Sequence, residues 1–332
     1  MASDKIRMGM IGCGGNARGH MGRLLGIEGV QIAALCDTAQ GSLKASVDKY
    51  SELEAVPQFA DYTQMLEQVE LDAVEISTPH TAHYEQIMAC LDAGLDVLTE
   101  KPMVCNVQHA KDIVQKAQQT GATLGVSYQR HLMAPYRYCR EVLASGEMGA
   151  CHFISCLQSQ NWYNGQVGGG TWRSKMALSG GGQLNDSGSH LLDIVLWMTD
   201  LQPAEVFAYI DNLGSEVDIL TAMSAKFDGG AMANFAVVGH AVNFFEEITL
   251  WCDTGTLAIR GQDVWRWDGS EQQKIISGEE LGRTWNPDAN FIAAIRNEEE
   301  IQAPPECGLR VIQLTEAAWR SGETGKPAPV MR

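Results

Sequence analysis

The chain has 332 residues, of which 45% are hydrophobic and 20% are charged, a mixture typical of globular proteins and long enough for two domains. Its formal net charge of −17 argues against nucleic acid and anionic membranes as partners, because both would repel the protein. The N-terminal stretch MASDKIRMGMIG is too short and too charged for a signal peptide, and no stretch has the roughly 20 uninterrupted apolar residues of a membrane span. Nine cysteines without a CxxC pair indicate a reduced, cytoplasmic chain without a structural metal site.

The first 125 residues alternate strand and helix signals. An apolar strand at 6–12 leads through a glycine turn into a helix from about residue 16, and a second strand covers 30–37. Strands at 71–78 and 95–100 are each followed by a helical segment, and a further strand covers 122–128. This succession of βαβ units predicts a parallel sheet covered by helices, in a first domain that spans residues 1–126.

The pattern changes after residue 127. A helix is predicted near 133–145, then a strand at 151–160, a glycine-rich loop at 164–170 and an apolar helix from about 187 to 198. Residues 204–268 alternate in strand fashion, and the stretches FDGGAMANFAVV, LWCDTGTLAI and DVWRWDGS carry hairpin signals. Two helices near 287–297 and 308–320 follow. We therefore expect a second α/β domain, 127–332, with a large, mostly antiparallel open sheet and helices on one face.

The glycine turn after the first strand has the spacing of a dinucleotide-binding loop. Gly12-x-Gly14-x-x-Ala17 follows a strand and opens a helix, so that the backbone can approach a pyrophosphate at the helix N-terminus. Asp37 ends the second strand, 20 residues after Ala17, where it can accept hydrogen bonds from ribose hydroxyls or, alternatively, cap a helix. Because Asp37 would repel a 2′-phosphate, the sequence favours NAD over NADP and predicts a Rossmann domain. Gly15 and Asn16 complete this cofactor-binding turn.

The carboxyl ends of the other parallel strands should line the same crevice. Three segments fall there, and their polar residues are further candidates for cofactor binding. They are Ser77, Thr78, Pro79 and His80 with His83 on the following helix, then Glu100 and Lys101, and finally Gln129.

The stretch GGGQLNDSGSHLLDIVLWM, 180–198, holds the candidate acid and base. Asp186 and His190 are four residues apart, about one helical turn, and would share a helix face. The simpler interpretation is a helix N-terminus followed by a buried histidine, because Asn185, Asp186 and Ser187 are all favourable N-cap residues.

Taken together, IGCGGNARGH, STPHTAHYE, TEKPM and GGGQLNDSGSH resemble the Gfo/Idh/MocA oxidoreductases, over essentially the whole chain. The resemblance implies a Rossmann domain, a C-terminal domain whose open sheet builds homodimers or homotetramers, and NAD(P)-linked oxidation or reduction of a sugar or cyclic polyol carbon. It implies that Lys101 lies near the nicotinamide and the reacting hydroxyl, that Glu100 lies beside the nicotinamide ribose, and that Asp186 and His190 are the substrate-binding acid and the general acid/base. Where the family pattern has FNRR, this chain has Tyr128-Gln129-Arg130-His131, which weakens Gln129 as a cofactor ligand.

Oxidation of a secondary alcohol sends a hydride to nicotinamide and a proton to a base. His190 can accept that proton near neutral pH, and the Lys101 ammonium can stabilise the developing alkoxide; a neutral Lys101 acting as the base is the alternative. Hydrogen-bonding and aromatic groups for a sugar ring stand between the strand at 151–160 and the apolar helix, although the tryptophans could instead pack under a long loop. The substrate-binding candidates are Gln160, Trp162, Tyr163, Trp172 and Arg173, together with Lys101, Asp186 and His190.

The sequence thus predicts an NAD-dependent dehydrogenase or reductase acting on a secondary alcohol carbon of a sugar, a sugar derivative or an inositol-like polyol. An alternative is a glycosidase that retains NAD and works by C3 oxidation and elimination. A non-catalytic sugar or NAD sensor is a second alternative, which the joint presence of Lys101, Asp186 and His190 opposes. The substrate, the carbon oxidised, the direction and the number of subunits do not follow from the sequence.

Overall fold

The computed structural model describes residues 5–269 and 273–332. The first four residues of the N-terminal stretch and Ser270 of the third hairpin stretch therefore lie outside the described residues. The chain divides into two compact units. The first comprises the chain up to Val104, Gln108–Ser127 and Asn286–Glu306; the second comprises Cys105–Val107, Tyr128–Trp285 and Cys307–Arg332. The segment Asn286–Glu306, expected in the second domain, thus belongs to the first unit.

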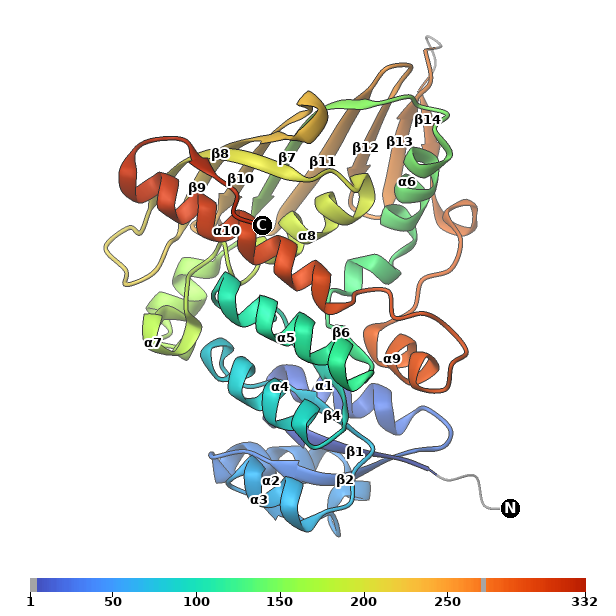
Figure 1. Cartoon of the computed structure of the whole chain (residues 1–332), viewed down its shortest axis with the longest axis vertical. Coiled ribbons are helices and arrows are strands. Elements are labelled where there is room, and N and C mark those ends of the chain that lie inside the picture. Colours follow the sequence, from blue (N-terminus) through green and yellow to red (C-terminus); the bar gives the residue numbers. More distant parts are fainter. Residues whose placement is uncertain (1–4, 270–272) are drawn as a thin grey trace. The chain divides into compact units, whose positions relative to one another are not determined.

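The first unit contains a six-stranded parallel sheet with strand order β3-β2-β1-β4-β5-β6. This is the order of a Rossmann fold, as predicted. Figure 1 labels β1, β2, β4 and β6 of this sheet. The strands are β1 Ile6–Ile11, β2 Val30–Cys36, β3 Gln58–Phe59, β4 Ala73–Ile76, β5 Asp96–Thr99 and β6 Leu124–Val126. The helices are α1 Gly15–Leu25, α2 Gln40–Lys49, α3 Tyr62–Gln68, α4 His83–Asp92, α5 Val107–Thr120 and α9 Pro287–Ile295. The sequence missed β3, because two residues are too few to show an alternation.

The core of the first unit explains why α9 belongs to it. Met8 and Met10 of β1 and Leu24 of α1 are fully buried, and Phe291 and Ile292 of α9 lie in the same apolar cluster. Each buried side chain of this size contributes roughly 1.5–3 kcal/mol to folding. The helix α9 is thus held to the Rossmann sheet although almost 200 residues separate it in sequence from β5.

The second unit contains a nine-stranded sheet with strand order β14-β13-β12-β11-β7-β10-β9-β8-β15. Neighbouring strands are antiparallel except β7 and β10, so the sheet is mixed and mostly antiparallel, as predicted. The strands are β7 Cys151–Ser159, β8 Pro203–Asp211, β9 Leu220–Phe227, β10 Met232–Val238, β11 Phe245–Cys252, β12 Thr256–Arg260, β13 Asp263–Trp267, β14 Lys274–Ile276 and β15 Ala328–Pro329. The helices are α6 Ala134–Ser145, α7 Met176–Ser179, α8 Gly188–Thr199 and α10 Pro305–Thr324; a short π-helix, Tyr163–Gly168, occupies the predicted glycine-rich loop.

The two faces of this sheet differ. Alternate residues of β9 are buried, and helices α6, α8 and α10 lie over one face of the sheet (Figure 1). Tyr209, Met232 and Trp251 are exposed apolar residues on β8, β10 and β11. Met232 and Trp251 both pair in register with Phe153 of β7, which lies between their strands, and therefore form an apolar row across three strands.

Within 5–269 and 273–332, no helix has the length and apolar character needed to cross a membrane. All nine cysteines carry free thiols. Most of these side chains are buried, where a free cysteine packs as a small apolar residue.

Candidate active site

The glycine turn after β1 is held close to the end of β4. Gly12 has φ +90°, and a Cβ at this position would lie 2.6 Å from the carbonyl oxygen of Ser77. The Gly12 N–H also donates to the carbonyl oxygen of Cys36 at 2.8 Å, which ties the turn to the end of β2. Both the backbone conformation and the close approach therefore require glycine at residue 12.

The turn leaves the N-terminus of α1 open. Gly14 occupies the N-cap and has no side chain to cap the helix, and the first turn contains no acid. The space where Cβ atoms of Gly14 and Gly15 would lie is empty within 4 Å. Backbone N–H groups at such an end favour an anion, so this turn fits the pyrophosphate of a dinucleotide. Asn16 is exposed beside it, whereas Ala17 packs inward.

Asp37 follows β2 directly and binds the glycine turn. Its Oδ2 accepts a hydrogen bond from the Cys13 N–H at 2.8 Å, and its Oδ1 accepts one from the Ala39 N–H at 2.7 Å. The N-cap residue of α2 is Ala39, so Asp37 does not fill that position. Each carboxylate oxygen retains a second lone pair, which leaves Asp37 able to accept bonds from ribose hydroxyls as well.

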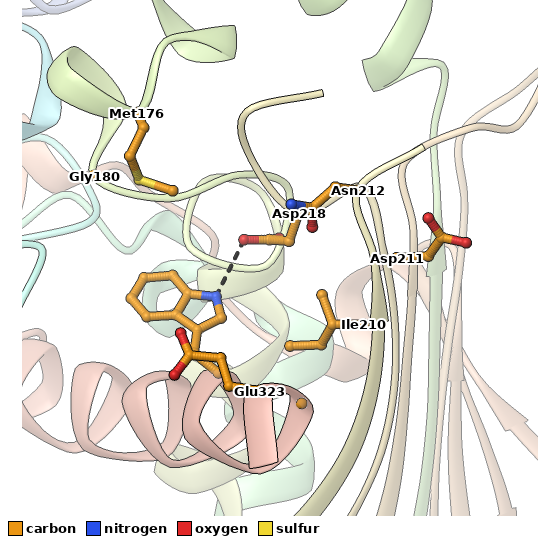
Figure 2. Close-up of a pocket in the computed structure, with 9 residues that line it drawn as sticks. Met176, Gly180, Ile210, Asp211, Asn212, Asp218 and Glu323 are labelled. Carbon is orange, nitrogen blue, oxygen red and sulfur yellow. Dashed lines mark hydrogen bonds between the residues drawn. The ribbon is translucent and has the colours of Figure 1, made fainter. Parts of the chain in front are cut away.

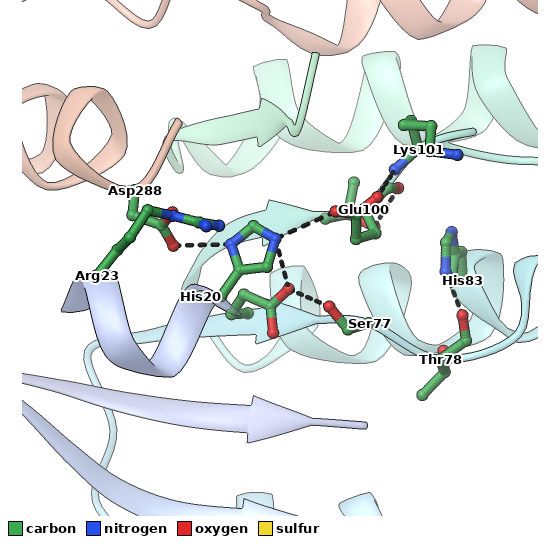
Figure 3. Close-up of polar contacts among 10 residues, drawn as sticks. His20, Arg23, Ser77, Thr78, His83, Glu100, Lys101 and Asp288 are labelled. Atoms are coloured by element: carbon green, nitrogen blue, oxygen red, sulfur yellow. Dashed lines mark hydrogen bonds and ion pairs between the residues drawn. The ribbon is translucent and has the colours of Figure 1, made fainter. Parts of the chain in front are cut away.

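The segment after β4 is held by hydrogen bonds between its own side chains and neighbouring residues. Ser77 Oγ donates to Glu75, and Thr78 Oγ1 donates to Gln86 Oε1 at 2.6 Å. His83 is fully buried, and its Nδ1 lies 2.9 Å from the Pro102 carbonyl oxygen. Its Nε2 lies 3.0 Å from the Thr78 carbonyl oxygen (Figure 3). Burial lowers the pKa of His83. His83 therefore links two loops and does not present its ring at the surface of the turn.

His80 and Pro79 belong to the same segment. His80 is buried, and its ring centre lies 5.9 Å from that of His83 in an edge-on arrangement. Pro79 is half-buried and precedes the short 3-10 turn His80–Ala82. Of the candidates in this segment, Ser77, Thr78 and Pro79 are partly accessible, while the two histidines are enclosed by protein.

Glu100 and Lys101 follow β5 at the carboxyl edge of the sheet. The Glu100 N–H donates to the Ile76 carbonyl oxygen and so extends the parallel ladder. Glu100 Oε2 accepts the Lys101 backbone N–H at 3.1 Å, and Glu100 Oε1 lies 3.1 Å from His20 Nε2 (Figure 3). Lys101 is only 8% exposed, and its peptide bond to Pro102 is cis. The sequence did not predict the contact with His20.

In the second unit, Asp186 lies just before a helix. The helix α8 begins at Gly188, so Asp186 and His190 do not share a face of a regular helix, contrary to our expectation. Asp186 lies instead in a turn, where its N–H donates to the Gly182 carbonyl oxygen at 2.9 Å and its own carbonyl oxygen accepts from Ser189 Oγ at 2.7 Å. Three glycines, one of them with positive φ, precede this turn and bend the chain ahead of the helix.

The Asp186 carboxylate is fixed by two residues expected to bind substrate. Trp162 Nε1 donates to Asp186 Oδ2 at 2.8 Å, and Arg173 Nε lies 3.2 Å from the same oxygen. Trp162 is 4% exposed, so its indole supports Asp186 from within and offers no open platform to a ring. The Arg173 guanidinium lies 4.4 Å from the centre of the Trp172 ring. Trp162, Arg173 and Asp186 thus form one group.

His190 lies in the first turn of α8 and is half-buried. Its backbone N–H donates to the Ser187 carbonyl oxygen at 3.2 Å. Its ring meets that of Tyr128 edge-on, with 5.9 Å between the ring centres. The imidazole is therefore oriented by an aromatic neighbour and remains partly accessible.

The remaining candidates of the second unit are tied to neighbouring segments. Gln160 Nε2 donates to Gln183 Oε1 at 3.1 Å, which links β7 to the turn before Asp186. Tyr163 stacks obliquely on His240, with 5.0 Å between the ring centres. Gln129 is exposed on the 3-10 turn Gln129–Leu132.

Asp218 holds the turn that carries Asp186, and the sequence did not single it out. It accepts hydrogen bonds from the N–H groups of Gly182 and Leu184 at 2.9 and 2.7 Å. It also accepts one from Trp319 Nε1 at 3.1 Å, drawn as a dashed line in Figure 2. Burial raises the pKa of Asp218. A pocket of about 470 Å³ adjoins this group. Its lining residues are Met176, Gly180, Ile210, Asp211, Asn212, Asp218, Trp319, Gly322 and Glu323.

A buried group in the second unit has the residue types of a metal site. Ligand atoms of His131, Asp193 and Cys307 lie within 4.8 Å of one another. His131 Nε2 and Asp193 Oδ2 are 2.7 Å apart, whereas two ligands of a tetrahedral zinc ion with bonds of about 2.0 Å would lie about 3.3 Å apart. The distance fits a hydrogen bond between His131 and Asp193, which anchors α8 to the segment after β6.

Comparisons with known proteins match both units. The family model described as "Oxidoreductase family, NAD-binding Rossmann fold" matches residues 6–128, and that of the GFO/IDH/MocA C-terminal domain matches residues 136–258. D-glucoside 3-dehydrogenase of Escherichia coli (strain K12) is 27% identical over 98% of this chain and 97% of its own length. Alpha-N-acetylgalactosaminidase of Tannerella forsythia is 31% identical over 48% of this chain and 37% of its own length. The WlbA dehydrogenase from Bordetella pertussis, crystallised with NADH and UDP-GlcNAcA, has the same fold, with a TM-score of 0.86, 24% identity and 99% of each chain covered.

Proposed function

Because the chain belongs to the Gfo/Idh/MocA family of oxidoreductases, we propose that it is an NAD-dependent dehydrogenase or reductase of a secondary alcohol carbon in a sugar or a cyclic polyol. The proposal rests above all on Asp186 and His190. Trp162 and Arg173 hold the acid in one position, and the imidazole that follows it is partly accessible. A capped helix alone would need neither the indole nor the guanidinium on that carboxylate.

The glycine turn supports the choice of cofactor. Asp37 and the uncapped start of α1 fit the ribose and the pyrophosphate of NAD, which accepts a hydride when bound. A 2′-phosphate would meet the Asp37 carboxylate, and we therefore assign NAD in preference to NADP. Glu100 and Lys101, at the carboxyl end of β5, are assigned to the nicotinamide end of the cofactor.

The reacting atoms require one base and one cation. As the carbinol carbon loses its hydride, the hydroxyl proton passes to His190, and the Lys101 ammonium stabilises the negative charge on the oxygen. Asp186 accepts a hydrogen bond from a substrate hydroxyl. Lys101, as a neutral amine, is the alternative base.

A substrate panel tests the function. Purified protein is incubated with NAD and a series of aldoses, glucosides and inositols, and NADH is followed by its absorbance. We expect one group of substrates to give NADH in proportion to product, and NADP to support the reaction less well than NAD. Release of an aglycone without net NADH would identify the glycosidase alternative instead. Absence of turnover across sugars and polyols, with NAD bound, would contradict the proposal.

A further inference from the structure

We propose that His20 is a positioning residue for the Glu100–Lys101 segment, which it holds in place as a buried imidazolium. Nothing in the glycine-turn pattern requires a histidine there. The inference deepens the proposed function, because Glu100 and Lys101 are the residues assigned to the nicotinamide and the reacting oxygen.

His20 stands on the inner face of α1, just after the glycine turn, and is 1% exposed. Its two ring nitrogens point to different segments of the first unit (Figure 3). Nδ1 lies 2.7 Å from Asp288 Oδ1 on α9, and Nε2 lies 3.1 Å from Glu100 Oε1 after β5. The ring therefore bridges α9 and the end of β5, which are distant in sequence.

The geometry sets the charge of the ring. A carboxylate oxygen only accepts hydrogen bonds, and both ring nitrogens face carboxylate oxygens, so both must donate. Only the imidazolium has two N–H groups. Burial lowers the pKa of His20, but the charge of Glu75 and the hydrogen bonds to Asp288 and Glu100 outweigh this effect and hold the pKa well above its usual value.

The neighbouring groups support that charge. Glu75 on β4 places Oε1 3.7 Å from His20 Nε2. Arg23, on the same helix as His20, pairs with the second oxygen of Asp288. The charged groups around the ring are thus Glu75 from β4, Glu100 from the end of β5, Asp288 from α9 and Arg23 from α1 itself.

Glu100 connects His20 to the backbone of Lys101. One carboxylate oxygen of Glu100 is held by His20, and the other accepts the Lys101 backbone N–H. If the imidazolium were removed, Glu100 Oε1 would lose its contact with His20, and the buried carboxylates of Glu75 and Asp288 would lose their nearby cation. Loss of His20 should therefore displace Lys101 and leave the glycine turn intact. A displacement of about 1 Å near the reacting atoms can cost about 10²-fold in rate.

The first measurement needs no activity. With ¹⁵N-histidine-labelled protein, NMR of the ring nitrogens reports the protonation of His20, assigned by comparison with His20→Gln. We expect both nitrogens of His20 to carry protons at pH 8, well above the usual histidine pKa of about 6.5. A neutral ring at pH 7 would overturn the proposal, whether or not the proposed function holds. The protonation is read from wild-type protein, and if His20→Gln does not fold, the His20 signals are assigned instead by through-bond correlation to the backbone of wild-type protein.

The second measurement separates positioning from structure. With the substrate from the panel, we expect His20→Gln to lower kcat about 10- to 100-fold while the Kd for NAD changes less than about threefold. Adding Glu100→Gln to His20→Gln should cost little more than either change alone, because the two residues act as one unit. A folded His20→Gln enzyme with wild-type kcat, or additive losses in the double variant, would refute the positioning role.

His152→Gln is the matched control. This residue also pairs with a carboxylate, that of Asp253, but it is exposed and lies in the second unit. Its substitution should change neither kcat nor the Kd for NAD. If no sugar or polyol is turned over by wild-type protein, the proposed function fails, whereas the protonation of His20 is still tested by NMR.

Discussion

Glu75 is a fully buried carboxyl group on β4, and burial raises its pKa from 4.5 to about 7. Between these two values the folded state binds more protons than the unfolded state at this residue. The contribution of Glu75 to stability is therefore present at low pH and is lost as the pH rises through about 7.

Glu75→Gln should remove this dependence. We expect the free energy of unfolding of the variant, relative to that of wild type, to be about 2 kcal/mol larger at pH 8 than at pH 5. The reason is that wild type must bury a carboxylate at the higher pH, whereas the amide does not ionise. Thermal unfolding followed by circular dichroism at both pH values measures the difference. A constant gap between the two melting temperatures across this range would show that Glu75 does not titrate there.

Substitution of His190 distinguishes a catalytic role of this residue from a purely structural one. His190→Asn should lower turnover by about 10²–10⁴, the usual contribution of a positioned acid or base. NAD should bind almost as in wild type, because the glycine turn and Asp37 belong to the other unit. If His190 only packs against Tyr128, the variant will instead have a lower melting temperature and keep its activity per folded molecule. Measuring turnover and melting on one preparation distinguishes these results.

At the scale of an element, the start of α1 depends on two glycines for different reasons. Gly12→Ala places a Cβ 2.6 Å from the Ser77 carbonyl oxygen at a φ of +90°, so we expect a loss of about 2 kcal/mol or more in stability. Gly14→Ala meets no atom within 4 Å, and Gly14 has an ordinary φ of −72°. It should leave stability almost unchanged and weaken NAD binding, because its methyl group occupies the approach of the pyrophosphate.

These two variants are each other's control. Differential scanning calorimetry gives the stability, and isothermal titration with NAD gives the affinity. Equal melting temperatures for Gly12→Ala and wild type would contradict the proposed close approach. Unaltered NAD affinity in Gly14→Ala would place the cofactor elsewhere.

At the scale of the molecule, the uncovered face of the nine-stranded sheet predicts a homo-oligomer. Met232, Phe153 and Trp251 lie in register on adjacent strands, and the rings of Phe153 and Trp251 are 5.7 Å apart. A contiguous exposed apolar surface on a sheet marks an interaction site. Light scattering at micromolar concentration should give a dimer or tetramer mass, and Trp251→Glu should shift it towards the monomer. Met331→Glu, at an exposed apolar residue near the C-terminus, is the control and should leave the mass unchanged.

Local patterns in the sequence predicted the parts of the fold that depend on neighbouring residues. The alternation of apolar strands and helices predicted the Rossmann sheet, and the spacing of Gly12, Gly14 and Ala17 predicted the turn before α1. The position of Asp37 after β2 followed from the same spacing. Each of these features depends on residues within one βαβ unit, whose handedness and connection length are constrained by the chain itself.

Tertiary structure alone decided which side chains support the candidate catalytic residues. His20 and Asp288 are 268 positions apart, and Asp218 is 36 residues from Gly182, whose N–H donates a hydrogen bond to it. Trp162 was predicted to face a substrate, yet its indole N–H donates to Asp186. Such contacts leave no periodicity in the sequence, because a buried hydrogen bond requires only that two complementary groups meet in space. The sequence thus determined the fold and the reactive residues that we propose, and the packing of distant segments determined what holds those residues in place.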